Sequence, residues 1–80
     1  MKIDLTKYKT VDKEESLVFN KKSLVKYSME EDYFEIRKDD TKVWVVTLDF
    51  ISGNKYFLIF MDKVEYYRFV ETELSWFGKE

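Results

Sequence analysis

The stretch VWVVTLDFISGNKYFLIFM, residues 43–61, decides the fold of this 80-residue chain. Two runs rich in β-branched and aromatic residues, Val43–Phe50 and Tyr56–Met61, flank a short polar segment, and this composition predicts two paired β-strands. Gly53 tolerates the positive φ that two-residue hairpin turns need, so Ser-Gly or Gly-Asn is expected at the turn. The stretch therefore predicts an antiparallel hairpin at the centre of the domain.

Side-chain alternation predicts which face of this hairpin is buried. The even-numbered residues of the first run are all apolar, whereas the odd-numbered ones include Thr47 and Asp49, so the even set is expected in the core. A two-residue turn would add odd-numbered residues of the second run: Phe57, Ile59 and Met61. The opposite face would then carry Tyr56, Leu58 and Phe60. Such a face is too apolar to face water, so either the chain's own strands or a partner should cover it.

Composition excludes several classes of protein. The sequence has no Cys and no His, which removes disulfides, thiol chemistry, the commonest general base and the commonest metal ligand. A net charge of −2 argues against a generic binder of nucleic acid or anionic membranes. No apolar run approaches the roughly 20 residues of a membrane span, and the first residues lack an apolar signal core. We therefore expect a cytoplasmic protein without cofactor, metal or membrane contact.

Residues before the central hairpin predict further strands. Met1–Thr10 is expected as a short strand or an ordered arm. Ser16–Asn20 and Leu24–Met29 are expected to form a hairpin, because each is short, apolar and next to a polar loop. An acidic turn at residues 30–32 should lead into a strand over Tyr33–Lys38. A three- or five-residue loop around residues 39–42 should follow, which keeps Phe34 and Ile36 on the core face.

The last third of the chain predicts one helix from Asp62 to Gly78. Asp62 is a good N-cap, Glu65 completes a capping-box pattern, and Gly78 suits the C-terminal stop. The helical period predicts a buried stripe: Tyr66, Tyr67, Val70, Leu74 and Phe77. Phe69 and Trp76 would form a second, exposed stripe. The predicted class is thus α+β, a single domain over residues 1–80, with a curved, partly open barrel-like antiparallel meander of four to six strands and a C-terminal helix.

No pattern in the sequence predicts catalysis. The acidic groups at residues 30–32 and at Asp39 and Asp40 fall in expected turns, where carboxylates serve solubility. Nucleophilic catalysis by Ser would need an adjacent base, and the chain has no His to supply it. The two Gly residues stand far apart, so no phosphate-binding loop is present. We therefore expect a protein that is not an enzyme.

The exposed helix stripe predicts a protein-binding surface. Phe69 and Trp76 would be the anchors, since aromatic residues are enriched at interfaces, and the polar rim would be Arg68, Glu65 and Glu73. The partner would be a protein of unknown identity or a second copy in a homodimer. The alternative is that the N-terminal arm covers these rings. Residue usage, with no Ala, Pro or Gln and much Lys, Phe and Tyr, is typical of AT-rich genomes and favours an inhibitor or adaptor from a phage, prophage or mobile element.

A second hypothesis is binding of single-stranded nucleic acid. Aromatic rings interleaved with basic residues on a sheet can stack bases and contact phosphates. The candidate residues are Tyr27, Tyr33, Arg37, Lys38, Lys55 and Tyr56. A meander followed by a helix also resembles, at the level of architecture, the single-stranded-DNA-binding coactivator and Whirly folds. Acidic residues next to each basic pair make nucleic acid the less favoured partner.

Overall fold

The computed structural model describes residues 1–10, 16–36 and 39–78, with the backbone alone over residues 34–36 and 39–40. The elements, in chain order, are β1 (Lys2–Asp4), η1 (Leu5–Lys7), β2 (Ser16–Val18), η2 (Lys21–Ser23), β3 (Leu24–Ile36), β4 (Asp39–Phe50), β5 (Lys55–Phe60) and α1 (Lys63–Glu73). The strands form two antiparallel sheets, β1-β2 and β3-β4-β5. The α+β class with a C-terminal helix is confirmed, whereas a single barrel-like meander is not.

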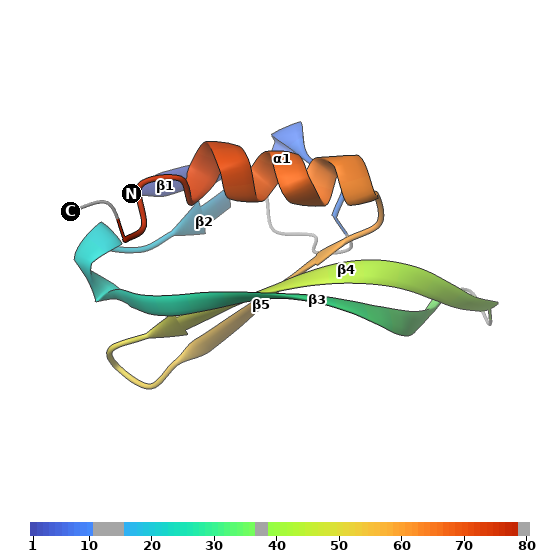
Figure 1. Ribbon diagram of the computed structural model, residues 1–80, viewed down its shortest axis with the longest axis horizontal. Helices are drawn as coiled ribbons and strands as arrows, with labels where there is room; N and C mark the ends of the chain where they lie inside the picture. Colours follow the sequence, from blue (N-terminus) through green and yellow to red (C-terminus); the bar gives the residue numbers. More distant parts are fainter. Residues whose placement is uncertain (11–15, 37–38, 79–80) are drawn as a thin grey trace.

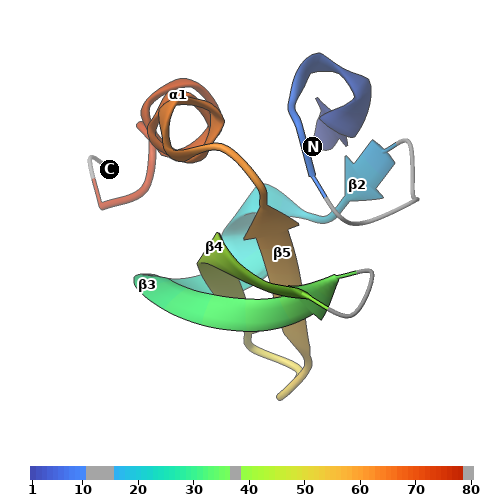
Figure 2. The same cartoon turned by 90° about the vertical axis from the view of Figure 1, so that its right-hand side faces the viewer.

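These elements lie in two layers. The three-stranded sheet forms one layer, and α1 lies beside the β1-β2 sheet in the other (Figures 1 and 2). Between the layers is a continuous apolar core, in which Phe60, Phe69, Leu48 and Leu58 are each 0% exposed. Because α1 and the N-terminal strands share one layer, they cover only one face of the large sheet.

The register of the central hairpin differs from the expectation. Asp49 lies opposite Lys55, and Gly53, with φ of 90°, donates its N–H to the carbonyl of Phe50 at 2.9 Å. The loop between Phe50 and Asn54 therefore has three residues, a hairpin type that places Gly in the left-handed region. A three-residue loop pairs even positions with even positions, so Leu58 and Phe60 join the core.

The predicted faces of the second hairpin strand are thus wrong. Leu58 and Phe60 are fully buried, while Phe57 is 57% and Met61 46% exposed. Ile59 lies half-buried on the face away from α1. The expectation for the first strand is better, because Val46 and Leu48 face the core as alternation predicts.

The predicted pairing before the central hairpin is also wrong in two places. β2 pairs with β1, not with β3, because Asn20 caps a 3₁₀ turn by accepting the Lys22 N–H at 3.0 Å and so redirects the chain. The expected acidic turn lies inside the 13-residue strand β3. There Glu31 accepts from the indole Nε1 of Trp44 at 3.2 Å and pairs with Lys42 at 3.1 Å, which makes an acidic residue tolerable in a strand.

The turn between β3 and β4 lies earlier than predicted. Ile36 is opposite Asp39, so residues 39–42 continue the strand instead of turning, and the link consists of residues 37 and 38, which lie outside the described residues. Phe34 is opposite Thr41. The expected three- or five-residue loop is therefore wrong, and the core-face position expected for the side chains of Phe34 and Ile36 lies outside what the structure describes.

The helix begins as predicted and ends early. The Asp62 carboxylate accepts the Val64 N–H at 2.8 Å, which is N-cap geometry, and α1 stops at Glu73. Leu74 and Phe77 then form a separate turn that reaches Gly78 at φ of 79°. Of the described helices none has the length and apolar character needed to cross a bilayer.

The buried stripe of α1 is shifted from the one expected. Tyr66 and Leu74 are buried as predicted, but Phe69 is 0% exposed and Tyr67 is 46% exposed. The centre of the Phe69 ring lies 5.2 Å from the ring centre of Phe60 and 5.4 Å from that of Tyr8, because the helix packs against both the sheet and the N-terminal arm. Two neighbouring elements widen the arc of the helix that is buried.

This arrangement predicts opposite outcomes for two aromatic truncations. Phe69→Ala should lower the free energy of unfolding by about 3–5 kcal/mol, since it leaves a cavity in the core. Tyr67→Ala should cost less than about 1 kcal/mol, because the ring is largely in water. Urea denaturation followed by circular dichroism measures both. Equal losses for the two variants would contradict the assigned helix face.

Candidate functional site

One face of the large sheet is left without cover by any described element. The two layers contact each other on the side of the large sheet that faces α1 and the β1-β2 sheet. No described strand or helix lies against the opposite side of the large sheet (Figures 1 and 2). We call this side the open face. Its described side chains on β3 are Lys26, Ser28, Glu30 and Asp32, those on β4 are Val43, Val45, Thr47 and Asp49, and those on β5 are Lys55, Phe57 and Ile59. Val43 and Thr47, in the middle strand, are nevertheless only 0% and 8% exposed.

The centre of the open face is apolar. Phe57 is 57% exposed, and Val45 and Ile59 are half-buried beside it. Together with Thr47, Glu30 and Asp32 these residues line a shallow hollow. An exposed apolar patch rimmed by polar groups is typical of a contact surface rather than of ordinary solvated protein surface.

Charged residues border this apolar centre on two sides. At the hairpin end, Asp49 lies between Lys26, at 3.9 Å, and Lys55, at 3.8 Å. Along β3, Glu30 and Asp32 are exposed and have no ion pair recorded among the described residues. The open face thus has a basic corner and an acidic corner on the same strand.

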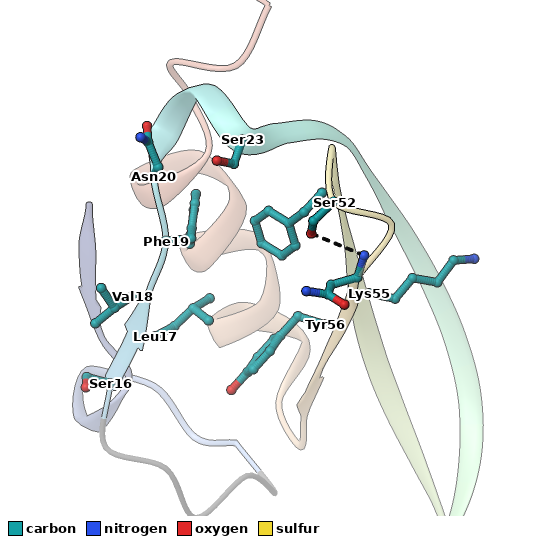
Figure 3. Close-up of a pocket in the computed structure, with 11 residues that line it drawn as sticks. Ser16, Leu17, Val18, Phe19, Asn20, Ser23, Ser52, Lys55 and Tyr56 are labelled. Atoms are coloured by element: carbon teal, nitrogen blue, oxygen red, sulfur yellow. Dashed lines mark hydrogen bonds between the residues drawn. The ribbon is translucent and has the colours of Figure 1, made fainter.

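A second hollow lies between β2 and the loop of the central hairpin. It has a volume of about 390 Å³ and is lined by Leu17, Phe19, Phe50 and Tyr56, with a rim that includes Asn20 and Ser52 (Figure 3). Asn54 donates its N–H to the Ser52 hydroxyl at 3.5 Å across the loop (Figure 3). Its described lining contains no carboxylate, so this hollow does not bring together an acid–base pair.

The structure does not support the helix surface predicted from the sequence. Phe69 lies in the core, so it is not an exposed anchor. Trp76 is half-buried in the turn after α1, where its ring contacts Phe19 at 6.4 Å and carries the Lys21 ammonium at 4.9 Å. The two rings therefore do not form one exposed stripe.

The expected polar rim instead ties α1 to the N-terminal arm. Tyr8 donates its hydroxyl to Glu73 at 2.8 Å, and the Arg68 guanidinium lies 4.9 Å from the centre of the Tyr8 ring. Arg68 also donates to the carbonyl of Lys7 at 2.6 Å and to Glu65 at 3.4 Å. These side chains therefore bind the N-terminal arm of the same chain. For Phe69, the structure agrees with the alternative in which this arm covers the helix rings.

The residues proposed for nucleic-acid binding do not share one face. Tyr27 packs against Phe77 at 5.6 Å on the α1 side, and Tyr56 is half-buried on the same side. Lys55 lies on the open face, and Tyr33 is 67% exposed on β3. Arg37 and Lys38 lie outside the described residues. The described members therefore form no single platform of stacked rings and cations.

Sequence reasoning missed Phe57 and Ile59 as surface residues. The signal that identifies them is electrostatic: Asp49 and Lys55 become direct cross-strand neighbours only when the loop has three residues. The two-residue turns considered would have placed Asp49 opposite an aromatic or apolar position instead. The charge pair at the hairpin end thus indicates how β4 and β5 are aligned, which the position of Gly53 alone does not determine.

Comparison with known proteins adds no family. No protein-family profile, curated protein or solved structure matches the chain. Within residues 1–10, 16–36 and 39–78, no group of three or more acidic side chains is placed to hold a metal ion. Any function must therefore be argued from the surfaces of this chain itself.

The buried hydroxyl of Tyr8 predicts a specific alkaline transition. Burial, together with the acceptor Glu73, raises the pKa of Tyr8 to about 12 from its ordinary value of 10.0. Between these values the unfolded chain loses the proton and the folded chain keeps it, so stability falls as pH rises, by about 2 kcal/mol. Urea denaturation from pH 8 to pH 12 should show a larger fall in the wild type than in Tyr8→Phe, where burial still raises the pKa of Tyr66 and so leaves part of the fall.

The matched control is Tyr33→Phe, because Tyr33 is largely exposed. Its free energy of unfolding should follow the wild-type pH profile throughout. Parallel profiles for wild type and Tyr8→Phe would show that the Tyr8–Glu73 contact does not shift the titration.

Proposed function

We propose that the chain is a non-enzymatic protein-interaction module and that its open face is the surface that binds. The observation that carries this proposal is the exposure of Phe57, a large ring 57% open to solvent on strand β5 of the open face, beside Val45 and Ile59. Most other rings of this aromatic-rich chain are buried or half-buried. Covering Phe57, Val45 and Ile59 would remove the chain's main exposed apolar surface on the sheet from water.

The border of the open face supports a protein partner. Interfaces combine an apolar centre with a polar rim, and aromatic residues serve as their anchors. Here Phe57 would be the anchor, and Glu30, Asp32, Lys26 and Lys55 would form the rim. The rim carries both signs of charge, which favours a partner with its own patterned charges over a uniformly anionic polymer such as nucleic acid.

The biological setting remains the one proposed from residue usage. A small inhibitor or adaptor from a phage, prophage or other mobile element, acting in the cytoplasm, would need no catalytic group and no cofactor. Such a protein acts by occupying a surface of its target. The sequence alone favoured a binding surface on the helix, whereas we now propose the open face of the sheet.

Photocrosslinking in the native cell tests this proposal. Benzoyl-phenylalanine at position 57 should give a discrete protein adduct, because this side chain is the exposed aromatic ring of the open face. The same residue at position 67 replaces an equally aromatic, 46% exposed side chain on α1 and should give none. Gel electrophoresis after nuclease treatment resolves the adducts.

Two outcomes would contradict the proposal. Adducts from position 67 and none from position 57 would place the surface on the helix. Adducts that disappear on nuclease treatment would favour the nucleic-acid alternative, in which Tyr33 and Lys55 contribute.

A further inference from the structure

The open face has a two-dimensional pattern that can be read as rows across the strands. From the hairpin end, the rows contain Lys26, Asp49 and Lys55; then Ser28, Thr47 and Phe57; then Glu30, Val45 and Ile59; and then Asp32 and Val43. The open-face side chains of β3 are polar, with Lys26 at one end of the strand and Glu30 and Asp32 at the other. The column on β5 is apolar over its inner two rows.

We propose that a second copy of this chain docks on the open face, with the two sheets packed face to face and their strands running in opposite directions. The two-fold axis lies midway between the two sheets and parallel to them, runs perpendicular to the strands, and passes between the second and third rows. This inference rests on the proposed function, because it names the partner of the same surface. An isologous contact of this kind closes on itself and forms a dimer.

The charge and apolar patterns both match under this single operation. β3 lies over β3 of the second copy with its direction reversed, so Lys26 lies over Asp32 of the second copy. β5 lies over β5 in the same way, so Phe57 packs on Ile59 of the second copy. Lys26 therefore lies next to an opposite charge, and the exposed ring of Phe57 lies on Ile59, while Val45 lies over Thr47 of the second copy.

The other in-plane two-fold axis gives a mismatched contact. An axis parallel to the strands would place β3 over β5 of the second copy with the rows aligned. Lys26 would then lie over Lys55, and the acidic Glu30 would cover the apolar Ile59. Like charges and buried unpaired carboxylates disfavour that arrangement.

The size of the face sets the strength of the dimer. Three strands about 4.8 Å apart and four rows about 6.6 Å apart give a flat footprint of roughly 300 Å². A standard interface buries about 800 Å² per partner, so the dimer is weak and reversible. Measurements of self-association must therefore extend to several hundred micromolar.

Charge exchange tests the contact between Lys26 and Asp32. Lys26→Glu and Asp32→Lys should each sediment as monomers at concentrations where the wild type is dimeric, with a dissociation constant at least tenfold higher. The reason is that each variant homodimer contains two like-charge contacts. A one-to-one mixture should recover the dimer, since both contacts again have opposite charge. Analytical ultracentrifugation measures all three samples.

The matched control is Lys22→Glu, which makes the same change in net charge at an exposed lysine away from the open face. It should dimerise as the wild type does. Circular dichroism checks that each variant is folded. A mixture that stays monomeric while its components are folded would overturn the proposed orientation.

Single cysteines give an independent test of orientation, because the sequence has no native Cys. A short bismaleimide, which alkylates one cysteine thiol at each end, suits the spacing of about 10 Å between packed sheets. It should join Lys26→Cys to Asp32→Cys several times faster than Lys26→Cys to Lys55→Cys. The reverse order of rates would show the parallel-axis arrangement and overturn the inference.

The two proposals fail in distinguishable ways. A wild type that stays monomeric to several hundred micromolar overturns the homodimer. If position 57 then still crosslinks to another protein in the cell, the interaction module stands with a different partner. If position 57 gives no adduct at all, both proposals fail.

Discussion

The three-residue loop between Phe50 and Asn54 determines which side chains the protein buries and which it exposes. Gly53 adopts φ of 90° there, and Asp49 pairs with Lys55 as a result. Because side chains alternate along a strand, one residue more or less in this loop would exchange the two faces of β5. The burial of Phe60 under α1 and the exposure of Phe57 therefore have the same cause.

The described elements cover one face of the large sheet. α1 and the β1-β2 sheet lie side by side in one layer, and the contacts of Tyr8 with Phe69 and Glu73 join them. That layer completes one core, in which most of the large buried side chains are gathered. The opposite face, with Val45, Phe57 and Ile59, has no second layer among the described elements. Its apolar character is what makes an external partner energetically favourable.

The sequence predicts the features that depend on local composition and fails where a feature depends on pairing. The α+β class, the central hairpin and the helix start at Asp62 follow from β-branched runs, a glycine and a capping residue. The pairing of β2 with β1, and the length of β3 through Glu31, depend on contacts between distant segments. The open face could be anticipated as an uncovered apolar face, but its residues could not, because the loop length that selects them was ambiguous.

The same sheet also explains why association would stop at a closed pair. β3 lies at the edge of the sheet among the described strands, and such an edge invites pairing with further chains. Its register shifts between Leu24 and Lys26, and its middle carries Glu30, Glu31 and Asp32, so edge-to-edge pairing of two copies through that segment would bring carboxylates together. Like charges at short distance disfavour that route. The open face, which we propose as the homodimer surface, would then let copies associate without forming an extended sheet.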